Sequence, residues 1–334
     1  MHKNRGLICL ALLLALILGP GASGLADQPA GVAAYFPIRP NARYVYEGTG
    51  NEYASYDVFV DYAQDTKMQQ RVDNGGTVLA RVVEVKEGAA KIVYTREEAY
   101  YRENFLNKEP NADEILLMEP LVEGTRWALA DGRERRIASV SAPVSTPSGD
   151  YTAVEVVTAS ENGTTADYYA MGVGLVKSVF RYGDFEVISA LAAVEEDAEL
   201  VRTIRFFYPD ANGETVKSAE APVRFRTNDI TRTALERAYR AASPFPVFSE
   251  NTRINSLYLN RDGMAYIDLN RAFLDDMNAG SGIEALILQS VANTFGQYYG
   301  VERVLLTIDD ELYESGHIAL RKGEYLKVRP EGGL

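Results

Sequence analysis

The hydrophobic pattern divides the chain into two parts, and this division constrains the fold more than any other feature. From about residue 35 to residue 194, apolar and polar residues alternate, as in the stretch 56–62, which reads YDVFVDY. One face of that stretch holds Tyr56, Val58, Val60 and Tyr62, and the other holds Asp57 and Asp61. A period of two residues is typical of a half-buried β-strand.

Seven further stretches in this part have the same character, and turn sequences separate them. The turns contain Asn-Gly, Asp-Gly or similar pairs, at 74–76, 87–88, 131–132, 162–163 and 182–184. One short segment, 95–104, reads TREEAYYREN and predicts a helix. The N-terminal part therefore predicts an antiparallel β domain, either a curved sheet or a partial barrel.

The pattern changes after about residue 197. A strand is predicted at 200–210, a loop with at most a short strand at 211–228, a helix within 229–246, a hairpin at 254–270, a helix at 282–299 and a strand at 303–310. This order, β-α-β-β-α-β, indicates a small sheet with helices on one face. The chain is thus predicted to be an α+β protein, with an all-β domain at 27–197 and a small α/β domain at 198–334.

The first 26 residues have the pattern of a secretory signal peptide. A basic start (MHKNR) precedes an apolar run at 6–18, and small residues follow. Cleavage is predicted after Gly24 or after Ala26, and a retained membrane anchor is the alternative. The only cysteine, Cys9, lies in this segment, so an intrachain disulfide is excluded. We expect the mature protein to be extracytoplasmic, either secreted or held in the cell envelope.

The net charge argues against two classes of partner. It is −13 for the whole chain, and it becomes −15 when the signal peptide removes Lys3 and Arg5. Nucleic acid and anionic membrane surfaces repel such a protein. We therefore expect no nucleic-acid partner, and membrane contact only through an uncleaved signal segment.

The stretch 280–295, GSGIEALILQSVANTF, resembles the start of a helix that could hold an anion. Such loops bind phosphate through unpaired backbone N–H groups. Here the neighbouring Asp275, Asp276 and Glu284 would oppose an anion. Ser281 and Glu284 instead fit a capping box, in which each side chain bonds the backbone N–H of the other residue. We predict a structural helix cap and no cofactor.

No pattern in the sequence predicts catalysis. Asp268, Asp309, Asp310 and Glu311 have neither a hydrolase spacing nor a metal-loop spacing. The histidines are His2 and His317, too few for a common zinc site, and no Gly-x-Ser-x-Gly motif is present. The sequence predicts a protein that is not an enzyme and holds no metal. It does not locate an interaction surface.

The C-terminal part resembles the GerMN domain, the sporulation and spore-germination domain. The similarity lies in Gly263–Leu269 (GMAYIDL) and in the 280–295 helix, and it extends over about 200–326. The N-terminal part resembles a secreted β domain found beside GerMN domains in spore-forming and related bacteria.

The resemblance implies a non-enzymatic envelope protein that acts as a protein-interaction or scaffold module in sporulation or spore germination. The implied partners are other envelope or sporulation proteins, or a second copy of the chain. An alternative is a carrier whose β domain holds a lipid or a cell-wall fragment. That alternative rests on 21 tyrosines in the chain, several of them in the predicted strands.

Overall fold

The computed structural model describes residues 30–329. The predicted signal peptide lies outside these residues, as does Cys9. The described chain opens with a short 3-10 helix, η1 Val32–Tyr35. Within 30–329, no helix combines the length and the apolar character needed to cross a membrane.

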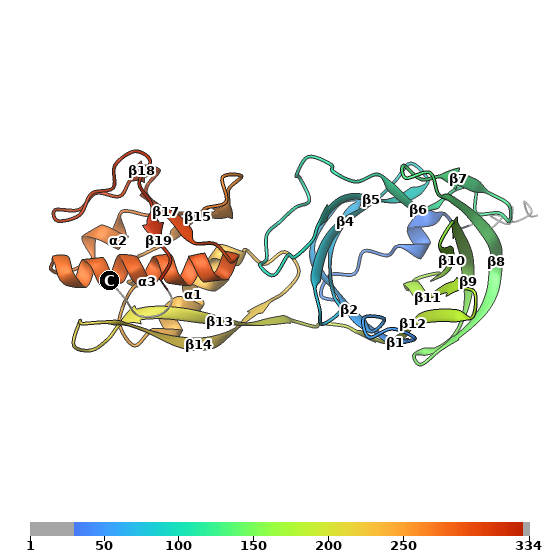
Figure 1. The fold of residues 1–334 in the computed structure, drawn as a ribbon, viewed down its shortest axis with the longest axis horizontal. Coiled ribbons are helices and arrows are strands. Elements are labelled where there is room, and N and C mark those ends of the chain that lie inside the picture. The colour runs from blue at the N-terminus through green and yellow to red at the C-terminus, as the bar shows by residue number, and fades with distance from the viewer. Residues whose placement is uncertain (1–29, 330–334) are drawn as a thin grey trace, which may run out of the picture. The chain divides into compact units, whose positions relative to one another are not determined.

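The N-terminal part is one antiparallel sheet of twelve strands (Figure 1). Its first six strands are β1 Arg43–Thr49, β2 Tyr56–Gln64, β3 Lys67–Asp73, β4 Val78–Lys86, β5 Ala89–Arg96 and β6 Glu114–Met118. The other six are β7 Arg126–Ala128, β8 Glu134–Thr146, β9 Gly149–Ser160, β10 Gly163–Ala170, β11 Gly174–Tyr182 and β12 Phe185–Glu195. The strand order is β6-β5-β4-β3-β2-β1-β12-β11-β10-β9-β8-β7.

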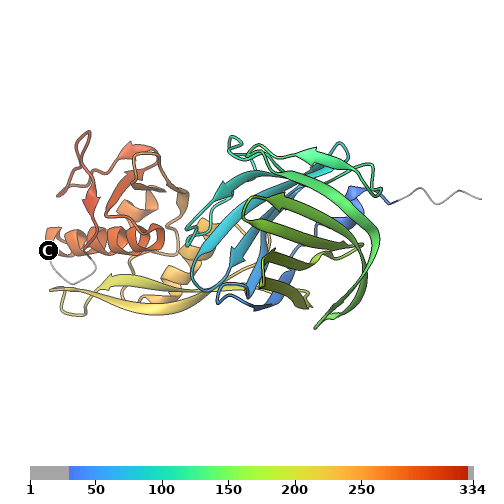
Figure 2. The same cartoon turned by 45° about the vertical axis from the view of Figure 1, so that its right-hand side comes forward.

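The sheet is strongly curved and open. Its first and last strands, β1 and β12, pair with each other in the middle of the order. Strands β6 and β7 lie at its two ends and are not paired with each other in the described chain. The two limbs of the sheet bend toward each other (Figure 2), and a cluster that includes Val60, Leu117, Ile137 and Val156 fills part of the inside. The predicted curved antiparallel sheet is confirmed.

The C-terminal part is a small mixed α/β domain. Its elements are β13 Leu200–Pro209, β14 Val216–Phe225, α1 Thr231–Ala242, β15 Ile254–Leu259, β16 Ala265–Leu269, α2 Ala272–Asp275, α3 Ser281–Tyr299, β17 Arg303–Ile308, β18 Glu311–Leu312 and β19 Leu326–Lys327. Strands β13 and β14 form a separate hairpin. The other strands form a sheet in the order β15-β16-β17-β18, and β19 also pairs with β17.

Helices α1 and α3 pack between the hairpin and this sheet (Figure 1). Each helix bonds the backbone of Phe207 in β13. The Tyr239 hydroxyl of α1 donates to the Phe207 carbonyl, and the Phe207 N–H donates to the Thr294 hydroxyl of α3. Phe295 packs near Tyr239 in the same core. Helix α3 ends at Gly300, whose φ of 68° places it in the left-handed conformation that favours glycine.

Two local predictions were wrong. The segment 95–104 is the end of β5 and a loop, because side chains from β3 take its backbone groups: Arg71 donates to the carbonyls of Ala99 and Tyr101, and Gln69 donates to that of Glu103. The hairpin partner of β13 is a full ten-residue strand rather than a loop with a short strand. In the first place, contacts distant in sequence decide the local structure, and in the second the segment pairs along its whole length with the neighbouring strand β13.

Candidate functional site

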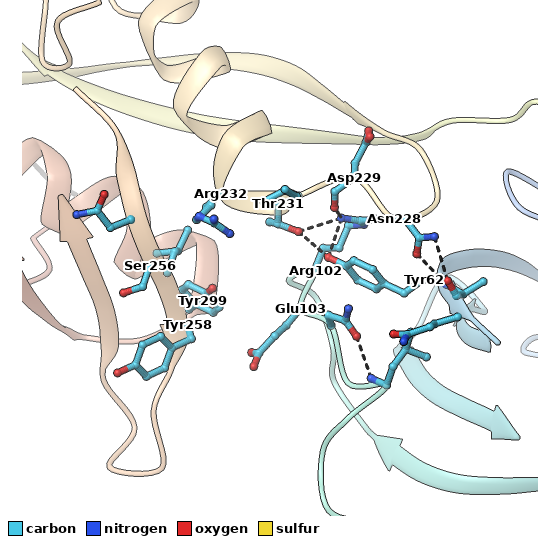
Figure 3. Close-up of a pocket in the computed structure, with 17 residues that line it drawn as sticks. Tyr62, Arg102, Glu103, Asn228, Asp229, Thr231, Arg232, Ser256, Tyr258 and Tyr299 are labelled. Carbon is cyan, nitrogen blue, oxygen red and sulfur yellow. Dashed lines mark hydrogen bonds between the residues drawn. The ribbon is translucent and has the colours of Figure 1, made fainter. Parts of the chain in front are cut away.

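A cleft of about 640 Å³ lies where the curved sheet meets the C-terminal domain. Four segments line it: the end of β2, the loop between β5 and β6, residues 228–232 at the start of α1, and strand β15. Tyr299, at the end of α3, completes the lining. Figure 3 shows Arg102 beside Tyr62 and Thr231, with Tyr258 and Ser256 on the strand across the cleft.

Arg102 bonds both parts of the chain and forms the floor of the cleft. The side chain is 2% exposed. Its Nη1 donates to the Tyr62 hydroxyl at 2.8 Å, the Asp229 carbonyl at 2.6 Å and Thr231 Oγ1 at 2.9 Å. Its Nη2 donates to the carbonyls of Asp61 and Arg226. Because a guanidinium has five N–H donors, all of its hydrogen-bonding capacity is used.

A single buried carboxylate balances two buried arginines. Asp61 is fully buried, and its Oδ1 accepts from Arg102 Nε at 3.3 Å and its Oδ2 from Arg71 Nε at 3.0 Å. The Arg102 guanidinium also lies 4.1 Å from the centre of the Tyr62 ring and 5.0 Å from that of Phe225. Burial raises the pKa of Tyr62, and the Arg102 charge opposes this shift. Tyr62 therefore stays neutral near pH 7.

The opposite wall of the cleft is the free edge of a sheet. Strand β15 is at one end of its sheet and pairs only with β16 among the described strands. Its first residue, Ile254, is covered: its N–H donates to Glu236 and its carbonyl accepts from Arg232 Nε. Residues 255–258 instead line the cleft, and Tyr258 is 39% exposed and stacked on Tyr266.

The predicted capping box at the start of α3 is not formed. Ser281 is the first residue of the helix, Gly280 is its N-cap, and no side chain bonds the cap. The Glu284 side chain is 2% exposed and accepts from the hydroxyls of Tyr313, at 2.8 Å, and Ser315. The pairing fails because the hydroxyls of the segment after β17 reach the Glu284 carboxylate and hold it inside the core.

The acidic residues singled out in the sequence hold a turn together. Asp268 accepts from Thr307 and from the N–H of Asp310, and Asp309 accepts from Asn255 and the N–H of Arg271. Glu311 is exposed in β18. His317 is exposed and lines a separate pocket with Glu284. Within the described chain, no three His, Cys, Asp or Glu side chains are grouped to hold a metal ion.

The residues that form the cleft floor were missed by sequence reasoning. Asp61 was assigned to a solvent face, but loop 97–106 covers that face and a bulge after Val60 shifts the strand register. Phe59 shares that face and was the signal that it is buried. Nothing in the sequence identifies Arg102 as the partner of Asp61, because its contacts come from residues 40 to 129 positions away.

Comparison with known proteins identifies part of the chain. The family model for the Germane domain, described as sporulation and spore germination, matches residues 205–314. A comparison with curated proteins gives no significant match.

The solved structures that are similar to this chain are distant matches. The tandem GerMN domains of the sporulation protein GerM from Bacillus subtilis are 20% identical with a TM-score of 0.28, over 37% of this chain and 45% of that chain. A protein with a YmcC-like fold from Bacteroides fragilis, described as exported, is 15% identical with a TM-score of 0.28, over 48% and 98%. A protein from Parabacteroides distasonis, described as a lipoprotein, is 13% identical with a TM-score of 0.30, over 50% and 100%.

The matched region runs from the middle of β13 to just beyond β18, and it includes both long helices and the free edge of β15. Residues 205–314 of this chain therefore match the Germane domain, and we call this region the Germane domain.

Proposed function

We propose that this protein is a non-enzymatic component of the cell envelope that binds another envelope protein through its Germane domain. In this proposal, an extended segment of the partner pairs with the free edge of β15 inside the cleft. The observation that carries it is the position of residues 255–258, which end the sheet and line the cleft at once.

The physics of sheet edges supports this mode of binding. An edge strand presents unpaired backbone N–H and carbonyl groups, and an added strand satisfies them. Tyr258 adds a rigid aromatic side chain beside that edge, and tyrosine is common among residues that dominate binding energy. The cleft floor is already ordered by Arg102, so little conformational entropy is lost there on binding.

The chemistry of the cleft supports a binding role rather than catalysis. The donors of Arg102 are all engaged within the protein, and burial keeps Tyr62 neutral near pH 7. Glu103, which also lines the cleft, is paired with Lys108 at 3.1 Å. These side chains are engaged in contacts within the protein, and the unpaired backbone groups of the β15 edge are the part of the cleft that a partner can bind.

The proposed location and process rest on other observations. The signal-like sequence at 1–26 supports an extracytoplasmic location. The family description of the Germane domain supports a role in sporulation or germination. A second copy of the chain is one partner that could pair with the β15 edge.

Site-specific photocrosslinking tests this function. A photoreactive phenylalanine analogue replaces Tyr258, and the matched control replaces Tyr182, an exposed tyrosine at the end of β11. We expect position 258 to crosslink one partner, which is then identified and purified. Tyr258→Ala should weaken binding of that partner by about tenfold or more, whereas Tyr182→Ala should not.

Two results would contradict the proposal. One is crosslinking from position 258 that does not exceed crosslinking from position 182. The other is hydrolysis of peptidoglycan by the purified protein. A crosslink between two copies of this chain would identify the partner as the protein itself.

A further inference from the structure

A second cavity, of about 410 Å³, lies inside the curved sheet and away from the Germane domain. Residues from both limbs of the sheet line it, from β1 to β6 on one limb and from β8 and β10 to β12 on the other. This volume is within the range of pockets that hold small molecules. The cavity shares no lining residue with the cleft, so a ligand bound here does not depend on the proposed partner binding.

Two groups of opposite charge face this cavity without an ionic partner in the described chain. Arg81, in β4, donates from Nε to Gln70 Oε1 at 2.8 Å, and no described group accepts from its Nη atoms. Asp167, in β10, accepts from Ser178 through Oδ1 at 2.6 Å, and no described group donates to its Oδ2. Both side chains are only half-buried, because the cavity leaves them accessible.

The other charges in the cavity are already paired. The Arg135 guanidinium donates to Glu114 at 2.6 Å, to Thr158 and to the Ile115 carbonyl. Desolvation raises the pKa of Asp167, and the Ser178 hydrogen bond and the charges of Arg135 and Arg81, neither of which is in ion-pair contact with it, oppose this shift. A charge that is partly shielded from water and forms no ion pair is unfavourable, so each of the two groups would gain from a ligand of opposite charge.

Tyrosines form the rest of the polar surface. The hydroxyls of Tyr56 and Tyr169 line the cavity and have no hydrogen-bond partner within residues 30–329. Burial raises the pKa of Tyr56 to about 12, so its hydroxyl remains a donor at neutral pH. The Tyr56 ring stacks on that of Tyr46 at 4.5 Å, which gives the cavity a flat aromatic wall.

We propose that this cavity binds a small zwitterion of the amino-acid type. The ligand carboxylate bonds Arg81, whose planar guanidinium matches a carboxylate in two parallel hydrogen bonds. The ligand ammonium bonds Asp167, and its body lies against the tyrosine wall. A zwitterion satisfies both unpaired charges together, whereas a simple anion or cation satisfies one and is repelled by the other.

Binding experiments on the purified full-length mature protein test this. Native mass spectrometry with an equimolar mixture of free amino acids and dipeptides should show a retained adduct. The bound compound, its C-terminal amide and its N-acetyl derivative are then titrated by calorimetry. The amide lacks the carboxylate and the N-acetyl derivative lacks the ammonium, so each should bind about tenfold more weakly or worse.

Variants assign the binding to this cavity. Arg81→Gln and Asp167→Asn should each abolish the adduct, and Tyr56→Phe, which removes only a hydroxyl, should weaken it. The matched controls are Arg181→Gln and Asp150→Asn, which change exposed residues of the same sheet and should bind as the unaltered protein does. Circular dichroism checks that each variant is folded, and Tyr56→Phe carries the test if a charge variant does not fold.

Three results would overturn the inference. The first is no adduct with any member of the mixture. The second is equal binding of the N-acetyl derivative, which would make the site one for simple anions. The third is binding that survives in Arg81→Gln.

Discussion

At the scale of single residues, Asp61 determines how the two parts of the chain are joined. It is the one carboxylate shared by Arg71 and Arg102, and all three side chains are buried. Arg102 in turn bonds the carbonyls of Arg226 and Asp229, just before α1. The loss of one carboxylate would therefore affect contacts on both sides of the cleft.

We expect Asp61→Asn to lower the free energy of unfolding by about 3–5 kcal/mol, because it leaves two buried arginines without a counter-charge. Urea denaturation of both proteins measures this. The control is Glu186→Gln, which removes an exposed ion pair with Arg181 and should change stability by less than about 0.5 kcal/mol. Equal effects of the two changes would mean that the buried cluster adds no specific stability.

Glu284 has a similar role on a smaller scale. Glu284→Ala leaves the buried Tyr313 hydroxyl without its acceptor, so we expect a loss of about 1–3 kcal/mol. Ser281→Ala should change stability by less than about 0.5 kcal/mol, because that side chain makes no cap bond. Thermal melts of the two variants distinguish the buried Glu284–Tyr313 bond from the capping box. A larger loss of stability from Ser281→Ala than from Glu284→Ala would support the capping box.

At the scale of elements, apolar periodicity in the sequence predicts helices and strands, but it does not predict loops and clefts that are formed by contacts between distant residues. Helix α3 and eight of the twelve strands of the curved sheet follow from regular apolar spacing, so their positions were predicted within a few residues, whereas β3, β6, β7 and β10 were not predicted. Loop 97–113 could not be predicted, because Gln69 and Arg71 in another strand satisfy its backbone. The cleft could not be predicted for the same reason: its lining comes from segments far apart in the chain.

Helix α3 stabilises the Germane domain through its buried face. Leu288 is 3% exposed in the core, so Leu288→Ala should lower the free energy of unfolding by about 2–5 kcal/mol through lost burial and a residual cavity. Val201→Ala, an exposed change in β13, should cost less than about 0.5 kcal/mol. Denaturant melts of the intact protein provide the comparison. A small effect of Leu288→Ala would show that the core relaxes around the missing side chain.

At the scale of the whole molecule, one core cluster contains residues from both parts of the chain. Val82 of the curved sheet belongs to the same cluster as Phe206 and Phe295 of the C-terminal part. The Tyr298 hydroxyl also accepts from the N–H of Arg102 at 2.9 Å. The domain boundary between residues 197 and 198 stays a prediction, and these contacts cross it.

The shared contacts imply that the C-terminal part depends on its neighbour. We expect residues 198–334, released by limited proteolysis or expressed alone, to have a lower thermal midpoint than the intact chain. The reason is that separation exposes apolar surface of the shared cluster. Identical midpoints would show that the two parts are energetically independent.

Buried tyrosines in both parts predict the response to high pH. Burial raises the pKa of Tyr46, Tyr239 and Tyr299 above the ordinary value of 10.0. Above pH 10 the unfolded chain loses these protons while the folded chain keeps them, so stability is complete below that pH and falls as the pH rises further. Denaturant melts from neutral to strongly alkaline pH should show this decline, with tyrosinate absorbance rising as the protein unfolds. Full tyrosine ionisation without unfolding would contradict it.

The pairing of β1 with β12 has a consequence for how the chain reaches this fold. Every other neighbouring pair in the curved sheet is consecutive in sequence and can form as a local hairpin during synthesis. The central pair joins Arg43 to Glu195, so one edge of β1 has no partner until the last strand of the sheet has been made. Contacts of such sequence separation form slowly, because a long loop must close first. The nascent chain thus carries an exposed strand edge until the last strand of the sheet has been made, and this interval is when it is most open to chaperones and to aggregation.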